Sequence, residues 1–273
     1  MEAAALLWLS VQYEMNVIVG GGTASGKTSF LNALLAFTPP NQRVVSIEDT
    51  RELLLPRFLH WTPMLTRLPN TEGRGGVGML DLVVNSLRMR PDRIVLGEVR
   101  RQNEAEVLFE AMHTGHSVYA TLHADDSVQV KNRLINPPIS LHESLLSALH
   151  LVVAQYRQRR TGIRRTLEIS EVIPSDGGIS FNIVYKWDPR EDLMERVGDH
   201  IRIDNEITGR TGMRAKEISK DLGEKQLILS AMLEAGIRRV DDVGLVFARY
   251  YKSPATVVES AAKGPAGMAR LIE

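Results

Sequence analysis

The sequence predicts a doubly wound α/β domain with a nucleotide site, followed by a helical domain. A glycine-bounded loop lies between a short apolar strand and an amphipathic helix, and further strands with polar carboxyl ends alternate with helices. After Asp188 the pattern becomes helical throughout. We therefore expect an α/β domain over residues 1–188, with a basic β-hairpin region near 151–187, and a helical domain over residues 189–273.

The composition is that of an ordinary globular protein. The 273 residues are 44% hydrophobic and 24% charged, which is enough to bury a core. Lysine and arginine together number 33, as do aspartate and glutamate, so the net charge gives no overall argument for binding nucleic acid or an anionic membrane. The absence of cysteine excludes disulfides, thiolate metal sites and cysteine nucleophiles. No apolar stretch is long enough to span a bilayer, so we expect a cytoplasmic protein.

Residues 21–28 read GGTASGKT and match the phosphate-binding pattern G-x-x-x-x-G-K-[ST]. The apolar run 16–19 and the helical pattern 29–35 supply the strand and the helix that this pattern requires. Its glycines let backbone N–H groups face a β-phosphate, Lys27 is expected to reach the β- and γ-phosphates, and Thr28 is expected to ligate Mg²⁺. The residues expected to contact the nucleotide are Gly21, Gly22, Thr23, Ala24, Ser25, Gly26, Lys27, Thr28 and Ser29.

The other elements of the first domain follow from local patterns. Apolar residues between Leu6 and Val11 give residues 3–14 the spacing of an amphipathic helix that covers the edge of the sheet. Strands are expected at residues 43–47, 64–68, 93–100 and 117–122, and helices at residues 79–89 and 104–112. Further helices are expected at 128–135 and 141–149, before antiparallel strands at 151–155, 165–173 and 179–187.

The second domain is expected to contain only helices. A hairpin turn at Asp176-Gly177-Gly178 joins the last two predicted strands, and the strand pattern then stops. Helices are expected at residues 193–202, 213–220, 224–235, 240–252 and 254–262.

Charged residues lie at the ends of several predicted strands. They are Glu48, Asp49 and Glu52 after the strand at 43–47, Glu98 and Arg100 at the end of 93–100, and His116 and His123 around 117–122. Because ligands of open α/β sheets bind at the carboxyl ends of strands, we expect these side chains beside the phosphate loop. Hydrolysis of a γ-phosphate requires a metal, an acidic group that orients water, and positive charge near the transition-state oxygens. Helix capping by Glu48 and Asp49, and a structural role for His123, are the simpler alternatives.

Taken in order, residues 16–29, 47–52, 94–100 and 114–124 resemble four motifs of one family. They are similar to the Walker A region, the Asp box, the atypical Walker B motif ending in Gly-Glu, and the His box of the secretion ATPases. These are the hexameric motors of type II secretion, type IV pili, type IV secretion and archaeal surface filaments. The resemblance implies a RecA-like P-loop NTPase core, and the helical tail resembles that of the archaeal branch.

By this resemblance the chain hydrolyses ATP with Mg²⁺. Lys27 and Thr28 would bind the phosphates and the metal. Glu48 would be the favoured water-activating carboxylate, with Glu52 as the second candidate. Glu98 would hold the metal through water, so Thr28 and Glu98 are the expected metal-binding residues.

The resemblance also assigns roles to positive groups. His123 would sense the γ-phosphate, and Arg88 and Arg100 match family arginines that act at the nucleotide or across the subunit boundary. Ala24 replaces the glycine usual in the loop, a change that the archaeal branch tolerates. The family's N-terminal domain, which clamps the nucleotide and helps to build the ring, is expected to be missing.

The partners implied are copies of the chain in a hexameric ring, an integral membrane platform protein and, indirectly, pilin-like or secreted subunits, which would place the chain at the inner face of the cell membrane. Nucleic acid is not expected as a partner. A nucleic-acid translocase, a small-molecule kinase and a nucleotide-binding assembly module with little hydrolysis stay open as alternatives. Zinc binding by His113, His116 and His123 lacks supporting cysteine or carboxylate ligands.

Two groups of arginines have simple explanations. The five arginines within residues 157–165 could contact nucleic acid or lipid, but a charged hairpin tip is favoured, because no aromatic residues interleave with them. Arg90, Arg93 and Arg101 are assigned to a solvated basic face.

Overall fold

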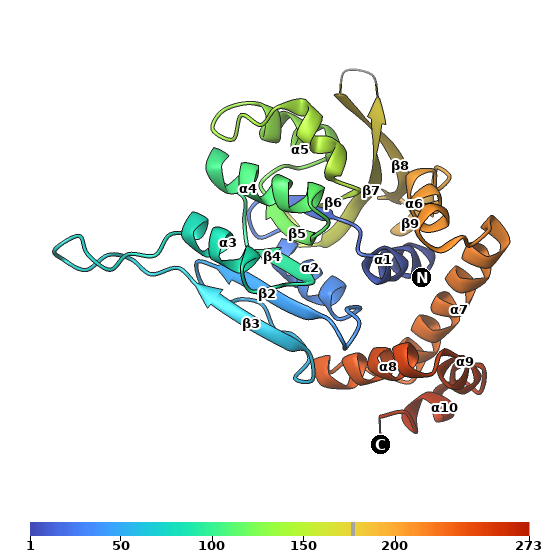
Figure 1. The fold of residues 1–273 in the computed structure, drawn as a ribbon. Coiled ribbons are helices and arrows are strands. Elements are labelled where there is room, and N and C mark those ends of the chain that lie inside the picture. Colours follow the sequence, from blue (N-terminus) through green and yellow to red (C-terminus); the bar gives the residue numbers. More distant parts are fainter. Residues whose placement is uncertain (176–177, 273) are drawn as a thin grey trace.

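The structure is a computed structural model that describes residues 1–175 and 178–272. Its centre is a sheet with the strand order β3-β2-β4-β5-β1-β6-β7-β8-β9 (Figure 1). The strands are β1 (Val17–Gly21), β2 (Arg43–Glu48), β3 (His60–Leu65), β4 (Arg93–Leu96), β5 (Ser117–Leu122), β6 (Leu151–Arg157), β7 (Arg164–Ser175), β8 (Gly178–Asp188) and β9 (Leu193–Arg196). Pairing is parallel from β3 to β6 and antiparallel from β6 to β9. The predicted α/β class is confirmed.

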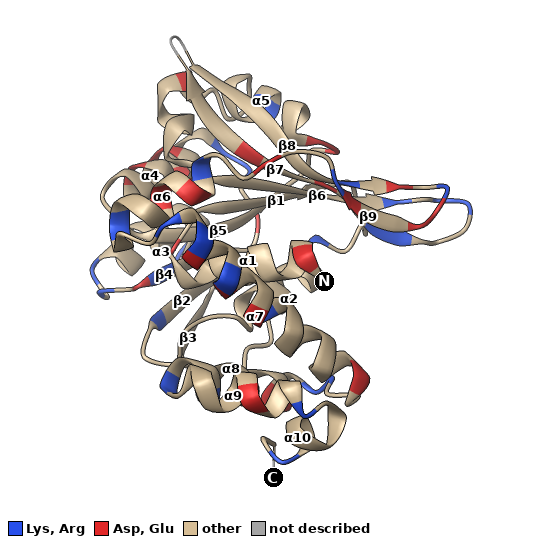
Figure 2. Ribbon diagram, turned by 90° about the vertical axis from the view of Figure 1, so that its right-hand side faces the viewer, with Lys and Arg blue, Asp and Glu red and all other residues tan. Residues whose placement is uncertain are grey.

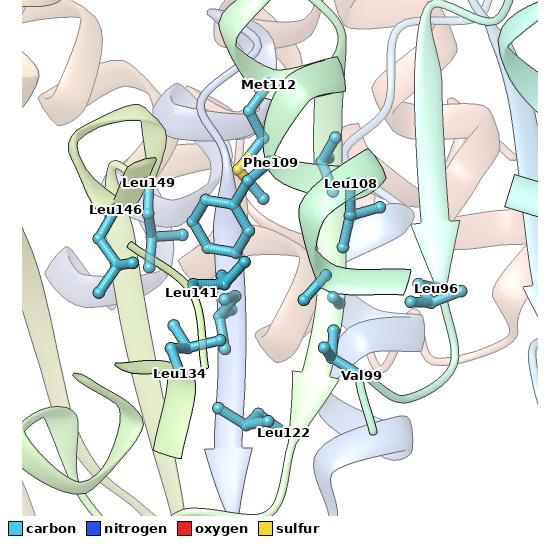
Figure 3. Packing of buried hydrophobic residues seen from close by; sticks show 14 of the residues in the cluster. Leu96, Val99, Leu108, Phe109, Met112, Leu122, Leu134, Leu141, Leu146 and Leu149 are labelled. Carbon is cyan, nitrogen blue, oxygen red and sulfur yellow. The ribbon is translucent and has the colours of Figure 1, made fainter. Parts of the chain in front are cut away.

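Helices cover both faces of this sheet because its central strands are apolar on both sides. In β1, Ile18 packs into one core and Val17 and Val19 into another, as the alternation of a strand requires. The first core also takes side chains from α3 (Met79–Leu87), α4 (Gln102–His113), α5 (Ser127–Ile135) and the 3₁₀ helix η1 (Glu143–Ala148). Figure 3 shows Phe109 and Met112 of α4 directed toward Leu146 and Leu149.

The second core takes side chains from α1 (Glu2–Gln12), α2 (Lys27–Leu35) and α6 (Arg202–Thr211). Helix α1 is buried from Ala5 to Val11 and packs against α7 (Ala215–Glu234), so it does more than cover a sheet edge. No helix in the described part of the chain has both the length and the apolar character that crossing a membrane requires. Acidic and basic residues are interspersed along the ribbon (Figure 2), in keeping with the balanced composition.

The edge strand β3 begins earlier than predicted. The expected strand at residues 64–68 is wrong in its bounds, because pairing with β2 runs from His60 to Leu65. Only one side of β3 is paired, so Pro63 is tolerated there. The segment between β3 and α3 projects from the body of the molecule (Figure 1).

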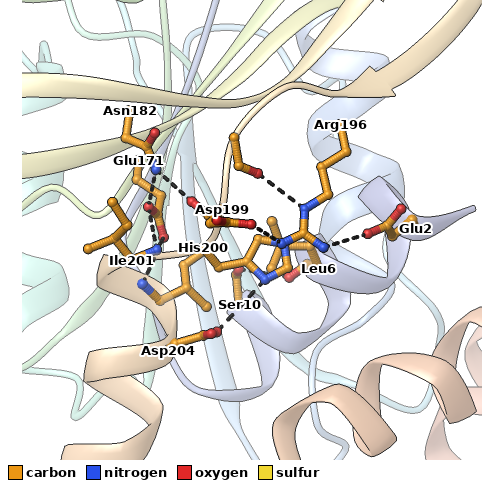
Figure 4. A network of polar contacts seen from close by, with 12 residues as sticks. Glu2, Leu6, Ser10, Glu171, Asn182, Arg196, Asp199, His200, Ile201 and Asp204 are labelled. Atoms are coloured by element: carbon orange, nitrogen blue, oxygen red, sulfur yellow. Dashed lines mark hydrogen bonds and ion pairs between the residues drawn. The ribbon is translucent and has the colours of Figure 1, made fainter. Parts of the chain in front are cut away.

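The predicted helix at residues 193–202 is wrong. Residues Leu193–Arg196 form β9, which pairs with β8, and α6 begins only at Arg202. The carboxylate of Glu171 in β7 accepts hydrogen bonds at the start of this helix. The donors are the backbone N–H groups of Ile201 and Ile203, each at 2.9 Å (Figure 4). Glu171 is fully buried, so the start of the helix is fixed by a residue far away in the sequence.

The remaining helices form a third core with the first part of the chain. The helices predicted at 213–220 and 224–235 are one helix, α7, followed by α8 (Val240–Lys252), α9 (Pro254–Ala262) and the unpredicted α10 (Pro265–Ala269). Trp8 and Phe37 pack with them, with ring centroids 5.6 Å apart and nearly parallel planes. Residues 141–149 contain a short 3₁₀ helix in place of the predicted α-helix. Since β9 extends the sheet beyond Asp188, the domain boundary there stays a prediction, and Asp176 and Gly177 of the predicted turn lie outside the described residues.

The assignment of Arg93 to a solvated face is wrong. This side chain is fully buried, with Nε donating to Gln42 Oε1 at 2.6 Å and Nη2 to the Val11 carbonyl at 2.6 Å. Its guanidinium lies 5.5 Å from the ring centroid of Tyr119. Arg90 and Arg101 are exposed, as predicted.

Candidate nucleotide site

A cleft of about 970 Å³ lies at the carboxyl ends of the parallel strands. Its lining includes most of the predicted site residues, namely Thr23, Ala24, Ser25, Gly26, Lys27, Thr28, Ser29, Glu48, Asp49, Glu52, Glu98, Arg100 and His123. They come from the loop after β1, the start of α2 and the segments after β2, β4 and β5. The parallel order of these strands brings their carboxyl ends to one edge, which is why residues distant in the sequence meet here.

The loop between β1 and α2 has the backbone of a phosphate-binding loop. Gly26 has φ +100° and precedes the first residue of α2, so the free N–H groups of the helix face the cleft. A Cβ on Gly21 would lie 2.7 Å from the Gln155 carbonyl oxygen, so only glycine fits between β1 and β6. Ala24 has φ +58°, a conformation that favours glycine.

The Lys27 ammonium lies within this loop. Its Nζ donates to the carbonyls of Gly21 at 2.8 Å and Gly22 at 3.0 Å. Partial burial lowers the pKa of Lys27, while the nearby carboxylate of Glu98 opposes this shift. The ammonium is thus held against the loop by the two carbonyls at its start.

Glu98, at the end of β4, is paired through both carboxylate oxygens. Its Oε1 lies 2.9 Å from His123 Nε2, and its Oε2 accepts from Arg100 Nε at 2.6 Å. Arg100 also donates from Nη1 to Asp49 Oδ2 at 2.5 Å, which connects the end of β4 to the end of β2. His123 Nδ1 lies 3.4 Å from Lys27 Nζ, so a neutral imidazole with its proton on Nε2 satisfies both contacts.

Glu48, the last residue of β2, is 3% exposed. Its Oε1 accepts from the backbone N–H groups of Glu52 at 2.9 Å and Leu53 at 3.0 Å. Its Oε2 is buried without a hydrogen-bond partner in the described structure, an arrangement that favours a further polar ligand at this oxygen. Glu52 is exposed, so the two candidate carboxylates lie in different surroundings.

Four predicted residues do not line the cleft: Gly21 and Gly22, whose carbonyls accept from Lys27, and also Arg88 and His116. Arg88 is exposed at the C-terminal end of α3 and does not line the cleft. His116 lies beside the end of α4, with Nδ1 3.3 Å from the Ala111 carbonyl oxygen, and also stays outside the cleft lining.

One wall of the cleft was not predicted from the sequence. Gln155 of β6 and Arg164, Arg165 and Thr166 of β7 line it beside the loop, and Arg164 Nε donates to the Ala24 carbonyl at 2.8 Å. The sequence indicated an apolar strand at 151–155 but grouped it with the antiparallel strands, whereas β6 also pairs in parallel with β1, which brings its carboxyl end to the same edge of the sheet.

The side chains present fit a Mg²⁺–nucleotide complex. Thr28 in the first turn of α2 and Glu98 after β4 offer oxygen atoms to the cleft, and Glu48 has an unpaired buried oxygen. Within the described residues no group of three or more His, Asp or Glu side chains is placed to hold a metal by itself. Magnesium in phosphoryl-transfer sites commonly takes one or two protein oxygens together with substrate phosphates and water.

The fold and the cleft together are those of a P-loop α/β nucleotide-binding domain. Over residues 2–170 the sequence matches the family described as Type II/IV secretion system protein. The chain belongs to this family, which confirms the membership expected from its four motifs.

Relatives occur in archaea and bacteria. An uncharacterised protein of Methanocaldococcus jannaschii is 36% identical over 232 residues, which are 81% of this chain and 83% of that protein. A putative conjugal transfer protein of Mycobacterium tuberculosis is 37% identical over 194 residues, covering 68% of this chain and 54% of that protein. The type IV secretion system protein PtlH of Bordetella pertussis is 36% identical over 172 residues, covering 58% of this chain and 50% of that protein.

Among solved structures, the VirB11 ATPase of the Brucella suis type IV secretion system, crystallised with sulphate, has a similar fold. The TM-score is 0.53 at 28% sequence identity, over 62% of this chain and 52% of that one. The chain thus spans most of the archaeal relative but about half of the bacterial proteins.

Proposed function

We propose that the chain binds ATP with Mg²⁺ in this cleft and hydrolyses it as a subunit of a hexameric secretion or pilus-assembly motor. The observation that carries the proposal is the convergence of Lys27, Glu48, Glu98 and His123 on one phosphate loop. Membership of the secretion family supports the coupling of hydrolysis to protein export or filament assembly.

The chain's own residues would bind and orient the reactants. Lys27 would exchange the carbonyls of Gly21 and Gly22 for β- and γ-phosphate oxygens, while loop N–H groups hold the β-phosphate. Glu48 would use its unpaired Oε2 to accept a hydrogen bond from the attacking water and then its proton. Mg²⁺, when held by Thr28 and Glu98, would neutralise phosphate charge.

His123 and Arg100 would respond to the γ-phosphate. His123 lies between Lys27 and Glu98, so a phosphate that draws Lys27 away also removes one partner of the imidazole. Arg100 joins Glu98 to Asp49, and its release would loosen the segments after β2 and β4.

In a ring, exposed groups would act between copies. Arg88 points to solvent outside the cleft of its own chain, and we assign it to a neighbouring subunit's nucleotide. The other partners proposed are an integral membrane platform protein and, through it, pilin-like or secreted subunits at the inner face of the cell membrane. The names of PtlH and VirB11 as type IV secretion proteins support this class of partner.

The test is ATPase activity measured against protein concentration with Mg²⁺, for the wild type, Glu98→Gln and Lys27→Ala. We expect activity that rises more steeply than linearly, is lost in Glu98→Gln with nucleotide still bound, and is lost in Lys27→Ala together with binding. Tight ATP binding with no hydrolysis at any concentration would instead indicate a nucleotide-binding assembly module. Strong stimulation by DNA that disappears with salt would indicate a translocase.

A further inference from the structure

The wall of the cleft formed by β6 and β7 carries a cation directed at the phosphate loop. Arg164, the first residue of β7, pairs in register with Arg157 of β6, and its Nε donates to the Ala24 carbonyl at 2.8 Å. Its Cδ lies 3.6 Å from the position that a Cβ on Gly26 would take. The side chain therefore lies across the loop from Ala24 to Gly26.

The neighbouring arginine has a different partner. Arg165 is bound by Asp192, with Nε to Oδ1 at 2.6 Å and Nη2 to Oδ2 at 2.5 Å, so its charge is matched within the fold. No carboxylate of the described residues forms an ion pair with Arg164, and its terminal nitrogens make no hydrogen bond there. A cation with no internal counter-charge, held at the rim of an anion-binding loop, indicates an anionic ligand.

Resting on the proposed function, we infer that Arg164 binds the polyphosphate of the nucleotide held by its own chain. The Ala24 contact uses only Nε, which leaves the Nη1 and Nη2 groups to donate to phosphate oxygens. The same contact fixes the guanidinium before the nucleotide arrives, so less side-chain freedom is lost on binding. Strand β7 would thus complete the phosphate site from the antiparallel part of the sheet.

The test compares ATP and ADP affinity, by competition with a fluorescent nucleotide, for the wild type, Arg164→Gln and Arg164→Lys. Glutamine can still donate to the Ala24 carbonyl but lacks the charge, whereas lysine keeps the charge. Arg159→Gln is the matched control, since Arg159 is exposed in the same hairpin and does not line the cleft. Lys27→Ala reports on the proposed nucleotide site itself.

We expect Arg164→Gln to weaken ATP binding by about tenfold or more, as for the loss of a hydrogen bond to a charged group, with Arg164→Lys in between. Arg159→Gln should change affinity little, and the urea midpoint of Arg164→Gln should match the wild type. An equal loss in Arg159→Gln and Arg164→Gln, or no loss in Arg164→Gln while Lys27→Ala abolishes binding, would overturn this assignment alone. A wild-type chain that binds no nucleotide would overturn the proposed function together with it.

Discussion

The imidazole Nε2 of His123 lies 2.9 Å from the carboxylate Oε1 of Glu98, which joins the end of β5 to the end of β4. The opposite ring nitrogen lies 3.4 Å from the Lys27 ammonium. A single histidine therefore bridges the phosphate loop and the acidic strand end. We expect a ligand that displaces Lys27 to remove one of the two contacts of this ring and so to alter its contact with Glu98.

Removing this bridge should slow hydrolysis more than it weakens binding. In His123→Ala we expect the hydrolysis rate to fall by about 10- to 100-fold, the usual effect of losing a residue that orients a metal-holding carboxylate, while the loop that binds phosphate is unchanged. Steady-state ATPase rates and nucleotide affinity measured on the same samples separate the two effects. His116→Ala is the control, since His116 lies outside the cleft, and an equal loss in that variant would argue against the role of His123.

The two carboxylates after β2 should differ in their effects. Glu48→Gln keeps an oxygen that accepts from the N–H groups of Glu52 and Leu53, so the fold should be retained. The amide cannot take a proton from water, so we expect hydrolysis to fall by roughly 100- to 10,000-fold with nucleotide still bound. Single-turnover hydrolysis measures this directly. Glu52→Gln, at an exposed position, should have the smaller effect, and the reverse order would make Glu52 the base.

Replacing Ala24 by glycine should stabilise the folded chain. Its φ of +58° is unfavourable for a residue with a Cβ, and relief of this strain exceeds the added freedom of glycine in the unfolded chain. We expect Ala24→Gly to raise the free energy of unfolding by about 0.5–1 kcal/mol, seen as a higher urea midpoint with an unchanged slope. Ala33→Gly, at an exposed position inside α2, should lower it by about 1 kcal/mol. Destabilisation by both substitutions would show that the loop is not strained at Ala24.

Local patterns predicted the part of the fold that local interactions determine. The strand, loop and helix around Lys27 follow from residues within 20 positions of one another. The gathering of Glu48, Glu98 and His123 was predictable because parallel strands place their carboxyl ends together.

The errors lie where a distant residue decides the structure. The start of α6 depends on the buried Glu171 carboxylate, and residues 193–196 form a strand only because β8 offers an unpaired edge. Arg93 is buried because Gln42, Val11 and Tyr119 surround its guanidinium, which no pattern around position 93 indicates. The contact between Arg164 and Ala24 joins residues 140 positions apart.

A buried histidine outside the cleft predicts how stability changes with pH. His150 is 6% exposed, and its Nδ1 accepts from the Asn16 backbone N–H at 3.1 Å, just before β1. Its Nε2 lies 3.5 Å from Glu206 Oε1 of α6. The hydrogen bond from His150 lowers the pKa of Glu206 from 4.5 to about 2, with Arg210 and Arg202 adding to the effect, and burial lowers the pKa of His150.

Both pKa shifts lower the free energy of unfolding in acid. A carboxyl group with a lowered folded pKa contributes stability that is present above its unfolded pKa and lost as the pH falls toward the folded value. The contribution of Glu206 should therefore be full above about pH 4.5 and vanish near pH 2. Neutral His150 should add a loss of stability that begins as the pH falls through about 6.5, its ordinary pKa.

Urea unfolding of the wild type and Glu206→Gln from pH 7 to pH 2.5 measures this pH dependence, with Glu191→Gln, an exposed position, as the control. We expect the stability difference between the wild type and Glu206→Gln to shrink steadily below pH 4.5. A difference that stays constant across this range would mean that the folded state does not favour the charged carboxylate of Glu206.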